Sequence, residues 1–88
     1  MLFEAKSKDS SIIVTVDLNG TTKGVQLEPE AMELADFELS NRIQRLNTLA
    51  FMRSQLAMRL QWEANNKTVL TPLPTEMQVQ RYEATIDF

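Results

Sequence analysis

Apolar and polar residues alternate through the first third of the chain, with the period of a half-buried β-strand. Residues 11–18 read SIIVTVDL and precede Asn19-Gly20, the pair that favours a two-residue type I′ hairpin turn. A second strand then follows the turn. The predicted cross-strand pairs are Leu18 with Thr21, Val16 with Lys23, Val14 with Val25, and Ile12 with Leu27. This register places the apolar residues of both strands on one face of a sheet.

An earlier strand extends the same pattern toward the N-terminus. Asp9-Ser10 is a plausible two-residue turn, and it makes Ala5 oppose Val14 and Phe3 oppose Val16. Both hairpins, assigned separately, agree on which side of the middle strand is apolar. The sequence therefore predicts three antiparallel strands with one buried face. The predicted apolar face comprises Phe3, Ala5, Ile12, Val14, Val16, Val25 and Leu27.

The centre of the chain, from Asp36 to about Asn66, contains neither Gly nor Pro and is predicted to form one helix. Its length would be roughly 45 Å at 1.5 Å per residue. Pro29 ends the third strand because it lacks a backbone N–H, and residues 30–34 favour a short helical turn. Asp36 is then the predicted N-cap of the long helix.

Apolar side chains surround this predicted helix, although covering one small sheet needs only a single stripe. An 88-residue chain has little else with which to cover them, so the surplus predicts a homodimer interface on the helix. The residues predicted for this interface are Leu46, Leu49, Phe51, Leu56, Met58, Leu60 and Trp62. Phe51, Met58 and Trp62 share a narrow arc, which fits either a partner-binding strip or ordinary core contacts.

The last part of the chain begins with a linker, residues 67–74. Thr75 with Gln78 three positions later forms a capping box, which predicts a short helix from Glu76 to about Ala84. The large apolar residues at the end of the chain predict that this tail docks. The fold class is thus α+β: a three-stranded antiparallel meander, one long helix and a short C-terminal helix, in a dimer. Residues 1–66 carry the meander and long helix, and residues 67–88 the linker and docking tail, in one domain.

The composition argues against catalysis. The chain has no Cys and no His, which removes thiolate ligands, the commonest general base and the commonest metal ligand. Gly20 and Gly24 both lie in the predicted hairpin, so no glycine-rich phosphate loop exists. Acidic residues cluster near the start of the long helix, where they suit capping and solubility, and a Mg²⁺ or Ca²⁺ site there would lack a loop signature. We expect no enzyme activity, no cofactor and no small-molecule substrate.

The net charge of -3 argues against bulk electrostatic binding of nucleic acid or anionic lipid. The N-terminus lacks a secretory signal pattern, and no window approaches 18 apolar residues. We therefore expect a cytoplasmic protein without a membrane partner.

Four arginines of the long helix fall within about a third of its circumference at 100° per residue. They are Arg42, Arg45, Arg53 and Arg59. Such a basic stripe on an acidic protein could contact phosphates. Alternatively, the arginines form salt bridges to the acidic cluster or to a partner subunit, with their stems packed on apolar surface.

Three consecutive parts of the chain carry a family resemblance: the strand and turn of residues 11–20, the segment Lys23-Gly-Val-Gln-Leu-Glu-Pro-Glu-Ala31, and the long helix. Together they resemble the YbaB/EbfC family of small bacterial nucleoid-associated proteins. The resemblance covers roughly residues 3–64, and residues 74–88 are similar to a small actinobacterial, mycobacterial-type branch. The chain differs in having no counterpart of the family's N-terminal helix and in carrying the added tail. The resemblance implies a homodimeric DNA-associated protein without enzyme activity. An adaptor that binds another protein, linked to mycobacterial type VII secretion, is the alternative.

Overall fold

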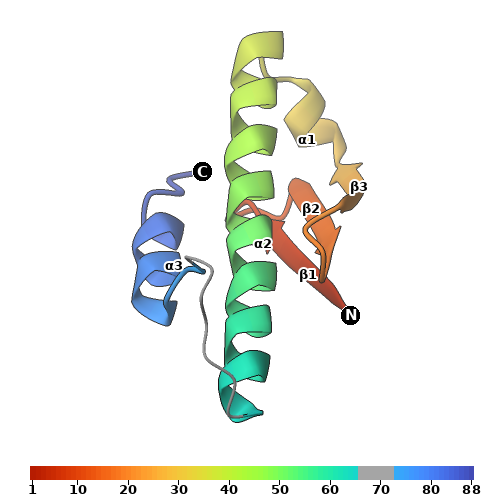
Figure 1. Ribbon diagram of the computed structural model, residues 1–88. Coiled ribbons are helices and arrows are strands. Elements are labelled where there is room, and N and C mark those ends of the chain that lie inside the picture. The colour runs from red at the N-terminus through yellow and green to blue at the C-terminus, as the bar shows by residue number, and fades with distance from the viewer. Residues whose placement is uncertain (66–72) are drawn as a thin grey trace.

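The computed structural model describes residues 1–65 and 73–88 of the chain. A long helix, α2, runs through the middle of the molecule, with a three-stranded antiparallel sheet on one side and a short helix, α3, on the other (Figure 1). The elements in chain order are β1 (Leu2–Lys6), β2 (Ile12–Asp17), β3 (Thr22–Leu27), α1 (Pro29–Met32), α2 (Asp36–Ala64) and α3 (Glu76–Glu83). The α+β class and the strand order predicted from the sequence are confirmed.

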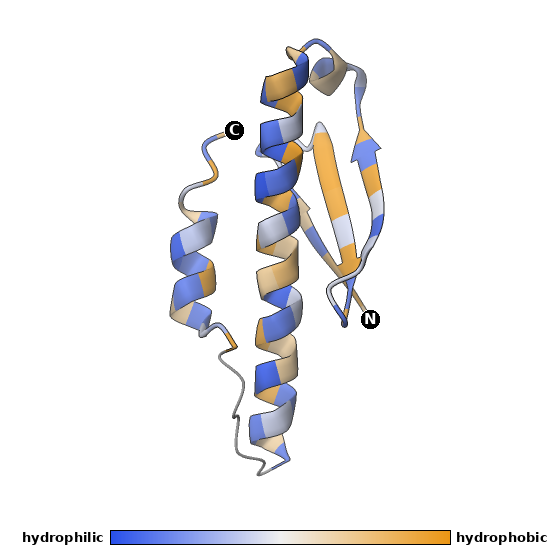
Figure 2. Cartoon of the chain, turned by 45° about the horizontal axis from the view of Figure 1, so that its top comes forward, coloured by the Kyte–Doolittle hydropathy of each residue, from blue (hydrophilic) through white to orange (hydrophobic). Residues whose placement is uncertain are grey.

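The core lies between β2 and α2. Ile12, Val14 and Val16 alternate along β2 and are fully buried, and they pack in one cluster with Leu46 and Ala50 of α2. Figure 2 shows that β2 is apolar over most of its length, whereas α2 mixes apolar and polar residues. Burying a large aliphatic side chain contributes about 1.5–3 kcal/mol, so this one layer supplies much of the stability of the domain.

The predicted buried face is wrong at Val25 of β3, whereas Leu27 of the same strand packs against the core. Val25 is 43% exposed, although its counterparts on β2 are completely covered. The reason is the position of α2, which packs on β1 and β2 and leaves the third strand largely uncovered. The sheet therefore has an edge strand with an open inward-facing side.

The first hairpin keeps the predicted register with a longer turn. Ala5 pairs with Val14 and Phe3 with Val16, as predicted. The Ser7 N–H donates to the Ile12 carbonyl at 3.0 Å, so the turn spans residues 8–11 rather than Asp9-Ser10 alone. The longer turn adds one residue on each side, so the faces of both strands are unchanged.

The second hairpin corrects the predicted turn. Gly20 N–H donates to Asp17 O, and Asp17 N–H donates to Thr21 O, both at 2.9 Å, with Gly20 in the left-handed region at φ 82. The loop is thus Leu18-Asn19-Gly20, the three-residue type closed by a left-handed glycine. This loop alone would reverse the faces of β3.

A β-bulge restores the predicted faces further along the hairpin. Val16 pairs with Thr22 instead of Lys23, and the register shifts between Thr15 and Val16. Lys23 is the additional residue of the bulge. The remaining pairs, Val14 with Val25 and Ile12 with Leu27, are those predicted from the sequence.

The helix ends agree with the sequence in part. The N-cap of α2 is Ala35 rather than Asp36, which instead lies in the first helical turn with Glu38. The capping box of α3 is confirmed, because Thr75 Oγ1 accepts from Gln78 N–H and the Gln78 side chain accepts from Thr75 N–H. Most of the predicted linker, residues 67–72, lies outside the described residues.

The end of the chain docks, as predicted. Ile86 is buried in the core cluster, and the Lys8 N–H of the β1–β2 turn donates to the Phe88 carbonyl at 2.7 Å. This contact places residues 85–88 across α2 from the sheet and beside the first hairpin.

Gly20→Val should destabilise the fold strongly, because the position needs a left-handed backbone and also lies under Phe51. A Cβ at Gly20 would stand 2.2 Å and 2.3 Å from two carbons of the Phe51 ring. The left-handed conformation alone costs a non-glycine residue about 1–2 kcal/mol. Urea denaturation should therefore show a loss of more than about 2 kcal/mol in the free energy of unfolding.

Gly24→Val provides the matched control. A Cβ at Gly24 meets nothing within 4 Å, and valine suits a strand. The control should leave stability unchanged or slightly raised. Equal losses in the two variants would contradict the proposed role of Gly20.

Candidate functional site

Four arginines of α2 lie along the side of the helix that meets the C-terminal part of the chain. We call Arg42, Arg45, Arg53 and Arg59 the arginine face. Each side chain is about one third exposed, so each has lost much of its contact with water. Their long stems pack on the helix surface while the guanidinium groups reach outward. These are the residues that the sequence offered for phosphate contact.

The Phe88 ring lies close to the guanidinium groups at the N-terminal end of the arginine face. The guanidinium carbons of Arg42 and Arg45 lie 4.9 Å and 5.0 Å from the ring centroid. Residues three positions apart on a helix point to the same side, which explains why both reach one ring. A cation within about 6 Å of an aromatic face is attracted by the negative charge of that face. Phe88 thus occupies a cationic site.

Each of these two arginines also has a polar partner in the chain. Arg42 Nε donates to Glu38 Oε1 at 2.9 Å. Arg45 donates to the Thr85 carbonyl, and its Nη1 lies 3.5 Å from Asp87 Oδ1. Arg45 therefore contacts the terminal segment through a main-chain oxygen, a carboxylate and an aromatic ring.

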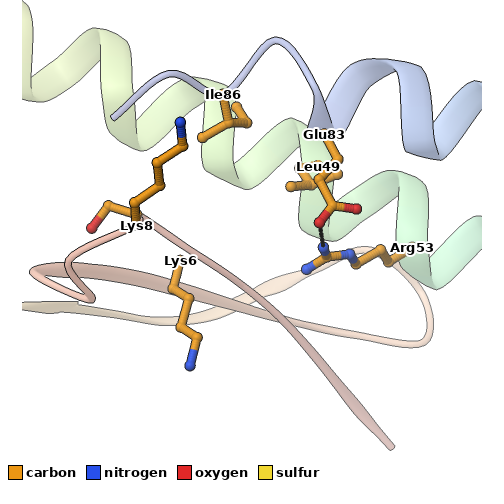
Figure 3. Close-up of a pocket in the computed structure, with 7 residues that line it drawn as sticks. Lys6, Lys8, Leu49, Arg53, Glu83 and Ile86 are labelled. Atoms are coloured by element: carbon orange, nitrogen blue, oxygen red, sulfur yellow. Dashed lines mark ion pairs between the residues drawn. The ribbon is translucent and has the colours of Figure 1, made fainter.

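Arg53 links three elements. Its Nη1 donates to the Glu4 carbonyl of β1 at 2.6 Å, and its Nη2 lies 3.4 Å from Glu83 Oε1 of α3. The ion pair borders a pocket of about 340 Å³ between the sheet and the helices (Figure 3). The pocket is lined by Lys6, Ser7, Lys8, Leu49, Arg53, Glu83 and Ile86.

The cations of this pocket do not converge on one point. In Figure 3 the Lys6 ammonium points away from the helices, while the Lys8 ammonium points toward the terminal segment. The Arg53 guanidinium is already paired with Glu83. The pocket therefore lacks a set of donors aimed at a single anionic group.

Arg59 completes the arginine face near the end of α2. Its Nε donates to Glu63 Oε1 at 2.9 Å, and its Nη1 donates to the Leu73 carbonyl at 2.8 Å. Three of the four arginines thus have polar partners within residues 73–88, and Arg42 contacts the Phe88 ring. Sequence spacing could have revealed the Glu38–Arg42 and Arg59–Glu63 pairs, which are i,i+4 neighbours. The contacts to Glu83, Asp87 and Phe88 depend on tertiary packing and gave no sequence signal.

The burial of α2 corrects part of the predicted dimer interface. Leu46 and Leu49 are buried in the core of the single chain, so they have no surface to offer a partner. Leu56 is half-buried against the same core. For these residues the apolar surplus is accounted for by the sheet on one side of α2 and α3 on the other.

Of the other predicted interface residues, Met58, Leu60 and Trp62 lie toward the end of α2, and Phe51 lies near its middle. The last turns of the helix extend beyond both the sheet and α3 (Figure 1). Leu60 is 52% exposed there, Met58 and Trp62 are half-buried, and Phe51 covers the Gly20 turn while remaining partly exposed. We call Met58, Leu60 and Trp62 the apolar end of α2. Their role as an interface stays a prediction.

Two aspartates in the hairpin turns have lowered pKa values. The Ser11 N–H and the Ser11 and Ser7 hydroxyls donate to Asp9, which lowers its pKa to about 2. The Thr21 N–H is the largest cause that lowers the pKa of Asp17, with Asn19 N–H and Lys23 contributing. Both carboxylates therefore order turns rather than act as proton donors or acceptors. Within residues 1–65 and 73–88, no three acidic side chains gather closely enough to hold a metal ion.

Comparison with protein-family models, curated proteins and solved structures finds no match to this chain. The resemblance to the YbaB/EbfC family thus rests on the sequence motifs alone. No helix within the described residues has the length and apolar character that a membrane span requires.

The pKa of Asp9 predicts acid sensitivity in the turn that receives the tail. A carboxyl whose folded pKa is lowered from 3.8 to about 2 stabilises the fold above its unfolded pKa. That contribution should be lost as the pH falls from about 4 to about 2. The Asp9 carboxyl should titrate near pH 2 in an NMR titration, and Asp9→Asn should remove its part of the pH dependence of unfolding. Titration near pH 4 in the folded protein would contradict the hydrogen-bonded turn.

Proposed function

We propose that this chain is a non-enzymatic, self-associating module that binds another protein. The proposal rests on the contacts that the four arginines of the arginine face make within their own chain. All four arginines have acidic or carbonyl partners in their own chain, as an adaptor predicts and a phosphate-binding ridge does not. Contacting phosphates would require these arginines to leave their present partners, a cost that a preformed nucleic-acid site does not carry.

The apolar end of α2 supports self-association. Met58 and Leu60 point to nearly opposite sides of the helix at 100° per residue, so its last turns are apolar on two sides. A helix with this pattern is typically covered by another element. A chain of 88 residues is near the size at which oligomerisation commonly adds stability. A second copy, crossing at the end of α2, would cover both sides.

A DNA-associated homodimer is the second candidate. The resemblance to the YbaB/EbfC family supports it, together with the placement of four arginines along one side of one helix. The acidic net charge and the engaged guanidinium groups favour the protein-binding alternative. The process in which a protein partner would act, type VII secretion included, rests on the resemblance.

Self-association predicts a mass of twice 10.1 kDa in light scattering at micromolar concentration. Leu60→Asp should shift the protein toward monomer, because a charge would enter a buried apolar contact. The fold of each chain should survive, because Leu60 is already half exposed within it.

Met77→Asp is the matched control, since Met77 is 61% exposed on α3 and is not part of the proposed interface. It should leave the mass unchanged. A wild-type monomer at about 100 μM, or equal dissociation of both variants, would rule out this interface.

The protein-binding alternative predicts no mobility change in a gel shift with duplex DNA at low salt. Non-specific DNA binders have dissociation constants of about 1–100 μM at physiological salt, so tens of micromolar dimer is a fair test. A clear shift would favour the DNA candidate instead. Arg42→Ala with Arg45→Ala should then reduce the salt dependence by about one unit per lost phosphate contact.

A further inference from the structure

We propose that Arg42 and Arg45, the N-terminal part of the arginine face, form a peptide-recognition site that the chain's own terminal segment, residues 85–88, occupies in cis. Its partner would be a segment of another protein with the same chemistry: an aliphatic residue, an acidic residue and an aromatic residue in sequence. The inference rests on the proposed function, because it names the class of partner that the module binds. It also assigns these two arginines a role that neither packing nor DNA binding requires.

Each side chain of the terminal segment meets a group suited to it. Ile86 is buried in the core cluster and lines the pocket beside Leu49. The Phe88 ring lies about 5 Å from the guanidinium groups of both Arg42 and Arg45. The site thus combines a buried position for an aliphatic side chain with a cationic clamp for an aromatic ring.

The backbone of the segment is bound as well. Arg45 donates to the Thr85 carbonyl and pairs with the Asp87 carboxylate, and Lys8 N–H donates to the Phe88 carbonyl at 2.7 Å. Main-chain oxygens, a carboxylate and an aromatic ring are features of a peptide. A nucleic acid has phosphates but no aliphatic side chain for the buried position that Ile86 takes. The observed contacts therefore favour a peptide partner.

The polar contacts that hold the segment suit an exchangeable occupant, while Ile86 is its buried anchor. The Asp87 side chain is 80% exposed, and ion pairs so exposed contribute little to stability. Among the described residues, the Lys8–Phe88 bond is the one main-chain hydrogen bond that joins the segment to the sheet. A tether raises the local concentration of the segment to roughly millimolar, so weak contacts suffice in cis. A partner peptide with more contacts could displace it.

An NMR titration of the full-length chain with the acetylated peptide EATIDF, the sequence of residues 83–88, tests the proposal. The Phe88→Ala variant should bind the peptide at least about tenfold more tightly than the wild type, because its own segment competes less. Amide shifts should centre on Lys8, Arg42, Arg45 and Leu49. Asp87→Asn leaves Ile86 and Phe88 in place. It should also bind the peptide more tightly than the wild type, but by a smaller factor than Phe88→Ala.

Matched variants separate recognition from a general charge effect. Arg45→Gln in the Phe88→Ala chain should weaken peptide binding by at least about tenfold. Arg81→Gln removes the same charge from an exposed position on α3 and should leave binding unchanged. A peptide with its Phe replaced by Ala should bind more weakly to every chain.

Absence of peptide-induced shifts at millimolar peptide, in both Phe88→Ala and Asp87→Asn, would overturn the proposal. So would a short DNA duplex that shifts these amides where the peptide does not. Conversion of a wild-type dimer to monomer by Phe88→Ala would show that the segment acts between copies, which also overturns binding in cis. Light scattering on the same samples tests self-association separately. A monomer that binds the peptide refutes the proposed dimer but not the peptide site. A dimer that does not bind the peptide refutes the peptide site but not the dimer.

Discussion

The packing of α2 against β2 is the contact on which the rest of the structure depends. β2 presents three fully buried aliphatic side chains, and α2 covers them with Leu46 and Ala50. A sheet of three short strands has no stability of its own without such a cover. Because α2 is much longer than the sheet, satisfying this contact leaves helix surface on other sides and beyond the end of the strands (Figure 1). These uncovered parts of α2 carry the features with functional interest.

The contacts of the arginine face arise because two separate layers pack on α2. The sheet takes one side of the helix, and α3 with the terminal segment takes another. Arg53 lies at the border between the two and contacts Glu4 of β1 and Glu83 of α3. Arginine suits such borders because its stem packs on apolar surface while its planar head binds several oxygens. The same chemistry that would suit phosphates thus serves to hold the two layers on α2.

The sequence predicted what local patterns determine and missed what tertiary contacts determine. The faces of β1 and β2 and the capping box of α3 follow from alternation and spacing, and they are confirmed. Both turns are longer than predicted, yet the faces survive because a bulge at Lys23 offsets the extra residue before Thr21. The exposure of Val25 depends on where α2 crosses the sheet, which no strand pattern contains.

The candidate site was harder to predict than the fold because its partners are remote in sequence. Arg45 and Asp87 are forty-two positions apart, and nothing in either neighbourhood points to the other. Counting 100° per residue correctly placed the arginines on one side of α2, but it could not identify the groups that contact them. An acidic chain with a basic stripe has two ways to balance that stripe: an external polyanion, or its own carboxylates and carbonyls. In this structure the guanidinium groups contact the chain's own carboxylates and carbonyls, and the 80% exposure of the Asp87 side chain shows that water easily reaches its ion pair with Arg45. The ion pair of Asp87 is therefore open to competition from a partner, whereas displacing the whole segment also requires Ile86 to leave the core cluster.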